Sequence, residues 1–113
     1  MRHGVETICK DRMFRRLYRS GKSIVKPLFV VYYRRNGLDR NRIGITASKT
    51  IGIAVQRNRA RRVLREAYRL SQNQIAKGYD LILVARTRTS CVSMNVIQQE
   101  LLAALKKEGL LLC

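Results

Sequence analysis

The segment RNRARRVLRE, residues 57–66, constrains the fold of this chain more than any other stretch. It holds five arginines and one glutamate in ten positions. On a helix of about 100° per residue, its small and aliphatic side chains share one face with the next residue, Ala67, at the spacing i, i+3, i+4, i+7: Ala60, Val63, Leu64 and Ala67. The arginines occupy the rest of the surface. The pattern predicts a helix that packs on a protein core and presents guanidinium groups to a polyanion.

The charge of the whole chain supports a polyanionic partner. The formal net charge is +17, and arginine supplies 17 of the 24 basic residues. An excess of this size predicts a nucleic acid or an anionic membrane as partner, and arginine favours planar phosphate contacts and base stacking. Because 46% of the residues are apolar, disorder is not expected. A length of 113 residues predicts one domain, residues 1–113, with RNA or DNA as the leading ligand class.

Several other classes of site are not expected. The three cysteines are far apart, the chain has one histidine, and no CxxC pair is present, so we expect reduced thiols, with Cys91 buried, and no metal site. The seven acidic residues are scattered, so no catalytic residue is expected in this chain. Without an apolar leader or a membrane-spanning apolar run, we expect a soluble, cytoplasmic protein with no membrane partner.

The sequence pattern predicts alternating elements around one sheet. Asp11 begins a helix that runs to about Ser20 and stops at Gly21, and Ser93 begins a last helix that ends at Lys107. In that last helix, five apolar residues are expected to face inward: Val96, Ile97, Leu101, Ala104 and Leu105. Strands are expected at 28–35, 42–49 and 79–86, the last one covered on both faces. The segment 71–78 reads as a polar linker, and the helices should back a single sheet.

A second group of candidate residues is aromatic. Phe14 and Tyr18 lie four residues apart on one helical face, and Tyr32 and Tyr33 must point to opposite sides of their strand. Rings flanked by arginine suit single-stranded nucleic acid, because every base offers a face for stacking. Phe14 is also a typical core residue. The two interpretations depend on whether the first helix covers the sheet completely.

The junction between the second predicted strand and the basic helix is more specific than the helix alone. Ser48 and Lys49 leave the strand, Gly52 allows a turn, and the arginines follow at once. With ASKTIGIAVQRNRARRVLREAY at residues 47–68, FRRLYRSGKS, LFVVYY and YDLILVAR, the chain resembles the protein component of bacterial ribonuclease P over nearly its whole length. That resemblance implies an α+β fold, a small two-layer α/β sandwich of order α-β-β-β-α-β-α with a left-handed βαβ crossover, against the usual right-handed rule.

The resemblance also implies a function and a set of site residues. The family's holoenzyme is an endoribonuclease that removes the 5′ leader from precursor tRNA, and its catalytic centre and Mg²⁺ ions belong to the RNA subunit. The partners implied are therefore the catalytic RNA and precursor tRNA, with no obligate protein partner. The residues that match the family's RNA-subunit contacts are Arg57, Asn58, Arg59, Arg61, Arg62 and Arg65. Those that match its leader-binding cleft are Phe14, Tyr18, Tyr32 and Lys49.

Two positions depart from the family pattern, and two other functions stay open. Thr50 stands where a second lysine is common, which predicts one phosphate contact fewer, and Ile53 stands where asparagine is common in the glycine loop. A structural RNA-binding protein of the ribosomal type could carry the same size and charge. A DNA-binding domain is less favoured, because the helix face that would read bases is nearly all arginine.

Overall fold

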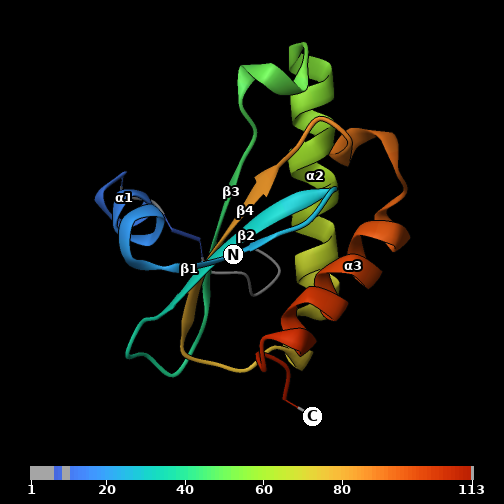
Figure 1. Cartoon of the computed structure of the whole chain (residues 1–113). Helices are drawn as coiled ribbons and strands as arrows, with labels where there is room; N and C mark the ends of the chain where they lie inside the picture. Colours follow the sequence, from blue (N-terminus) through green and yellow to red (C-terminus); the bar gives the residue numbers. More distant parts are fainter. Residues whose placement is uncertain (1–6, 9–10, 113) are drawn as a thin grey trace.

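The computed structural model of the chain describes residues 7–8 and 11–112 (Figure 1). The helices and strands follow in the order α1 (Asp11–Ser20), β1 (Lys22–Val25), β2 (Phe29–Arg35), β3 (Arg42–Thr46), α2 (Ala54–Ser71), β4 (Tyr79–Ala85) and α3 (Met94–Lys107). Short 3₁₀ turns precede α2, follow it and precede α3: η1 (Lys49–Ile51), η2 (Gln72–Gln74) and η3 (Thr89–Cys91). The predicted order of helices and strands is confirmed.

The four strands form one mixed sheet in the order β1-β2-β4-β3. The pairs β1–β2 and β2–β4 are antiparallel, whereas β3 and β4 are parallel and connected through α2. The α+β class is therefore confirmed: the sheet is one layer, and α2 with α3 is the second. Helix α1 lies on the opposite side of the sheet (Figure 1). The left-handed sense of the βαβ crossover stays a prediction from the family.

The main core lies between the sheet and the helices α2 and α3. Alternate residues of the central strands point into it, and Phe29, Val31 and Leu83 are fully buried. The predicted apolar face of α2 is buried as expected, with Ala60, Val63, Leu64 and Ala67 all in contact with this core. In α3 the prediction holds for all inward residues except Val96, whose side chain is 39% exposed. Val96 lies at the edge of the helix stripe, where periodicity alone does not decide burial.

A smaller apolar cluster holds α1 against the other face of the sheet. Leu17 and Ile82 are buried, and Phe14 and Tyr32 pack around them. Gly44 is required here, because a Cβ atom at that position would lie 2.6 Å from Cζ of the Phe14 ring. The Phe14 ring therefore packs directly against the backbone of β3 at Gly44. Phe14 is half-buried, so its role combines packing with partial exposure.

Three further local features differ from what the residue pattern indicated. Strand β1 was not recognised in the residue pattern, because its four residues KSIV form an exposed edge strand without a regular apolar repeat. The segment expected as a polar linker contains Ile75, which is fully buried and forms an isolated bridge with Leu111. Cys91, expected to be buried, is exposed; the other two cysteines lie outside the described residues.

Candidate nucleic-acid interface

The outer face of α2 is a surface of cationic side chains on a helix that the core fixes. Asn58, Arg62 and Arg65 are exposed, while Arg57 and Arg61 are half-exposed beside the buried stripe. Because the opposite side of α2 is packed into the core, these groups project from a rigid support. Glu66 does not interrupt the surface, since it binds Arg69 on its own helix through two hydrogen bonds of 3.1 and 2.8 Å.

Hydrogen bonds orient four of the six polar side chains on this face and leave two arginines unengaged. Arg57 donates to the Gly52 carbonyl at 3.0 Å, and Arg59 donates to the Ser90 carbonyl at 3.0 Å. Arg61 donates to the Asn58 side-chain oxygen at 2.6 Å. Within the described residues, Arg62 and Arg65 make no hydrogen bond or ion pair. These two guanidinium groups are therefore the ones most available to an external anion.

The loop that begins α2 has a geometry that only glycine allows. Gly52 has φ of 141°, and a Cβ atom there would lie 1.8 Å from the Gln56 side-chain oxygen. That oxygen accepts a hydrogen bond of 3.0 Å from the Ile53 amide, which satisfies one of the first free N–H groups of the region. Because isoleucine has no side-chain acceptor, only this half of a capping box forms. The departure at Ile53 thus removes one cap and leaves an apolar side chain that is 68% exposed.

The departure at Thr50 changes the chemistry of the turn η1. The Thr50 hydroxyl lies 2.6 Å from that of Ser48, so the two side chains share a hydrogen bond where the family pattern would place a second ammonium group. Lys49 is exposed in the same turn. The turn follows β3, whose last residue, Thr46, pairs with Val84. Lys49 therefore lies just beyond the end of β3, near the Thr46–Val84 pair.

The aromatic side chains meet at the edge of α1. The rings of Tyr18 and Tyr32 are 4.8 Å apart between centroids with an interplanar angle of 87°, and Tyr18 is 43% exposed. Phe14 packs in the same cluster, so these three residues form what we call the aromatic edge. Tyr33 points to the other side of the sheet, as predicted. Its hydroxyl donates to Glu108 at 2.7 Å, and burial together with that carboxylate raises its pKa to about 12.

Beside the aromatic edge, a strip of the sheet is not sealed by α1. The strand register places Val30, Val84 and Thr46 side by side, with Val25 next to Val30 on the edge strand. Val25 is 67% exposed, and the other three are half-buried. Since the strip adjoins Tyr32, an exposed ring and an open apolar floor lie next to each other. This arrangement suits the flat faces of unpaired bases.

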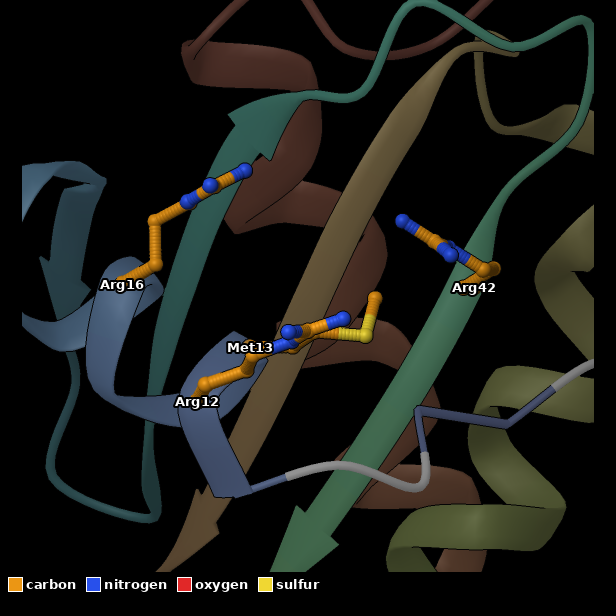
Figure 2. Close-up of a pocket in the computed structure, with 4 residues that line it drawn as sticks. All are labelled: Arg12, Met13, Arg16 and Arg42. Carbon is orange, nitrogen blue, oxygen red and sulfur yellow. The ribbon is translucent and has the colours of Figure 1, made fainter.

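A group of arginines between α1 and the sheet was missed by reasoning from the sequence. Arg12 and Met13 reach from α1 across β4 toward Arg42 of β3, while Arg16 extends from the same helix over β2 (Figure 2). The hollow they line has a volume of about 540 Å³. Strand register was the signal needed to find it, because Arg34, Asp80 and Arg42 are aligned only once the order β2-β4-β3 is known.

Metal sites and membrane-spanning helices are both absent from the part of the chain that the structure describes. No group of three or more histidine, cysteine or acidic side chains is placed to hold a metal ion there. No helix among the same residues is long and apolar enough to cross a membrane. The charged and aromatic surfaces around α1 and α2 are therefore the main functional candidates in a small, strongly basic α+β domain.

Comparison with known proteins identifies the family of this domain. A family model described as Ribonuclease P matches residues 4–109. The ribonuclease P protein component of Natranaerobius thermophilus is 39% identical over 107 residues, covering 95% of this chain and 93% of that protein. The protein of Alkaliphilus oremlandii is 37% identical over 107 residues, covering 95% and 94%.

Solved structures agree with the sequence relatives. The Staphylococcus aureus ribonuclease P protein superimposes with a TM-score of 0.82 at 34% identity, covering 94% of this chain and 97% of that one. The Thermotoga maritima protein gives a TM-score of 0.81 at 33% identity, covering 90% and 96%. The chain therefore belongs to the ribonuclease P protein family.

Proposed function

We propose that this chain is the protein subunit of a ribonuclease P holoenzyme that removes the 5′ leader from precursor tRNA in the cytoplasm. The reaction is endonucleolytic hydrolysis of one phosphodiester bond. In this proposal the RNA subunit supplies the catalytic centre and holds Mg²⁺ together with the substrate. The protein supplies binding surfaces and no catalytic residue. The observation that carries the proposal is the combination, within this family's fold, of a rigid arginine face on α2 and exposed rings beside α1.

The arginine face of α2 is proposed to dock on the catalytic RNA. Phosphate oxygens accept the planar, paired N–H groups of arginine, and each neutralised phosphate releases condensed counterions. Arg62 and Arg65 are exposed and have no hydrogen-bond or ion-pair partner within the described residues, so binding RNA does not first require breaking an internal interaction. Arg57, Asn58, Arg59 and Arg61 flank them, and all four side chains take part in hydrogen bonds that orient them.

The aromatic edge is proposed to hold the single-stranded leader. Tyr18 offers an exposed ring, Tyr32 supports it at 4.8 Å, and Phe14 fixes the base of the helix on the sheet. Lys49 is proposed to contact a leader phosphate where β3 ends. Binding of the leader on one surface and the catalytic RNA on another would favour precursor over mature tRNA. It would also place positive charge where RNA strands and Mg²⁺ converge.

Reconstitution with a matching catalytic RNA tests the proposal. At low Mg²⁺ the protein should accelerate cleavage of a precursor tRNA and should raise its affinity more than that of mature tRNA. A structural RNA-binding protein of the ribosomal type would bind RNA without a preference for unpaired 5′ nucleotides. Absence of both acceleration and leader preference would reject the proposal in favour of that alternative.

A paired substitution tests the docking face separately from catalysis. Arg62→Gln with Arg65→Gln should weaken binding to the catalytic RNA and lower the salt slope by roughly one for each phosphate that is no longer neutralised. Lys106→Gln with Lys107→Gln is the matched control, since it removes the same charge from the last turn of α3. Equal slopes for both variants would show that only net charge matters and that α2 is not the docking face.

A further inference from the structure

The hollow between α1 and the sheet continues into two neighbours. The part of about 540 Å³ is lined by Arg12, Met13, Arg16 and Arg42 (Figure 2). A second part of about 210 Å³ and a third of about 490 Å³ both include Arg16 and add Arg34. Arg16 lines all three parts, so they lie next to one another around this side chain. We call four of their arginines, Arg12, Arg16, Arg34 and Arg42, the arginine basin.

Among the residues that the structure describes, the charge of the arginine basin is not balanced from within. Asp80 is the acidic residue of this part of the chain that lines the basin, and Arg42 occupies both of its carboxylate oxygens with hydrogen bonds of 2.8 Å each. Asn36 donates a third bond of 3.0 Å to the same carboxylate. The side chains of Arg12, Arg16 and Arg34 have no hydrogen-bond or ion-pair partner within the described residues. Three unpaired guanidinium groups around a hollow favour a phosphate group as ligand.

A belt of arginines connects the basin to the aromatic edge over the solvent side of α1. At about 100° per residue, the side chains met in turn when circling the helix away from the sheet are Tyr18, Asp11, Arg15, Arg19, Arg12 and Arg16. All six are exposed. Asp11 lies in the first turn of α1, about two turns from Tyr18 along the axis, so a polyanionic strand that leaves Tyr18 can pass to the neighbouring Arg15 and Arg19 and then to the basin on the far side of the helix.

We propose that the arginine basin binds phosphates of the precursor leader, upstream of the nucleotides held at the aromatic edge. The inference rests on the proposed function, because it requires that a leader binds at Tyr18. The chain of the leader passes over α1 along the arginine belt, and its phosphodiester groups enter the hollow beside Arg12, Arg16 and Arg34. Arg42 is a positioning residue here, since Asp80 already engages its guanidinium group.

The test uses the reconstituted holoenzyme and a set of precursor tRNAs whose leaders are lengthened one nucleotide at a time. For the wild type, affinity should rise with leader length and then level off. Arg12→Gln with Arg16→Gln should level off at a shorter leader and bind long-leader precursors roughly tenfold less tightly at about 0.15 M salt. That figure follows from two phosphates left without a guanidinium partner, at a salt slope of about 0.7 each for single strands.

Two further variants make the result interpretable. Arg34 lies on β2, outside α1. Arg34→Gln should also make the affinity level off at a shorter leader than in the wild type, independently of any effect on α1. Lys106→Gln with Lys107→Gln removes two charges far from α1 in sequence. It should leave unchanged the leader length at which affinity levels off. Circular dichroism of each free protein checks that the fold is retained.

Each outcome bears on the proposal. The proposal is supported if affinity levels off at a shorter leader in both basin variants than in the wild type. An equal loss of affinity for every leader length, including none, overturns it and assigns the basin to another RNA segment. The proposal is also overturned if affinity levels off at the same leader length as in the wild type, and the arginines are then a solvated surface. If the wild type itself shows no dependence on a leader, the proposed function fails and not only the basin.

Discussion

The two faces of the sheet contain similar apolar residues but are covered to different degrees. One face packs against α2 and α3, which have 18 and 14 residues, and its central side chains Leu81 and Leu83 are essentially inaccessible. The other face packs against α1, which has ten residues. There Leu17 and Ile82 are sealed, yet Val25 is 67% exposed and Val84 is half-buried.

The contrast separates stability from binding. Two long helices exclude water from the first face, so that face provides most of the apolar burial that stabilises the fold. One short helix leaves part of the second face open, and the open part is bordered by exposed rings and arginines. A ligand can therefore add to the second face without displacing the core. Substitutions confined to one face should therefore leave the role of the other face unchanged.

The largest expected effect comes from truncating one leucine on each face. Leu64→Ala in α2 should lower the free energy of unfolding by about 4 kcal/mol, because the surrounding core cannot collapse into the cavity. Leu17→Ala in α1 should cost only about 2 kcal/mol, since a short helix can shift to fill part of the space. Urea denaturation measures both. Similar losses would mean that α1 is held as rigidly as α2.

The next effect is a pH dependence confined to the core face. Burial raises the pKa of Tyr68 to about 12 from 10.0, so the neutral phenol is favoured in the folded state. Its contribution to stability is complete below pH 10 and is lost between pH 10 and 12, by about 3 kcal/mol in total. Tyr68→Phe should make the decline shallower than in the wild type. Tyr33, whose pKa is also about 12, should supply the part that remains. Superimposable stability curves for the wild type and Tyr68→Phe would contradict this assignment.

A substitution at Gly44 tests how α1 is seated on the open face. Gly44→Ala places a methyl group 2.6 Å from Cζ of Phe14, so the ring must move, at a cost of about 1–3 kcal/mol. Combining it with Phe14→Leu should recover part of that loss, because the smaller side chain leaves room for the methyl group. A double-mutant cycle from urea denaturation gives the coupling. Strictly additive losses would show that Phe14 does not rest on Gly44.

The smallest effect on folding, but a specific effect on binding, is expected at the aromatic edge. Tyr18→Ala should reduce the preference of the holoenzyme for precursor over mature tRNA by about 1–3 kcal/mol if one base stacks on the ring. Tyr18→Phe keeps the ring and should behave like the wild type. Binding of mature tRNA is the internal control. An equal loss of affinity for precursor and mature tRNA would show that the leader does not bind at Tyr18.

Regular elements with strong periodicity were predictable from the sequence. The stripe Ala60, Val63, Leu64 and Ala67 is buried as expected, because a period of 3.6 residues leaves one face to pack. Strand β4 was recognised as covered on both faces, since a nearly continuous apolar run tolerates no exposed side. The family resemblance then supplied the candidate residues. Their roles in binding RNA remain predictions.

Other features depended on partners that the local sequence does not contain. Strand β1 gains its hydrogen bonds from β2, so its four residues carry little apolar signal of their own. Ile75 is buried where Leu111 arrives from the other end of the chain, and Val96 is exposed at the edge of the apolar stripe of α3. Arg42 and Asp80 are separated by 38 positions and meet only through the parallel pairing of β3 with β4.

The sequence by itself determined that this protein is basic, that α2 has an arginine face opposite a packed one, and that a glycine loop joins it to a strand. Periodicity and charge are local properties, so one chain of residues is enough to read them. Only the tertiary structure decided that α1 covers part of a sheet face, that Tyr18 meets Tyr32, and that four arginines surround one hollow. Those contacts join segments distant in the sequence, and their geometry follows from strand order and helix placement.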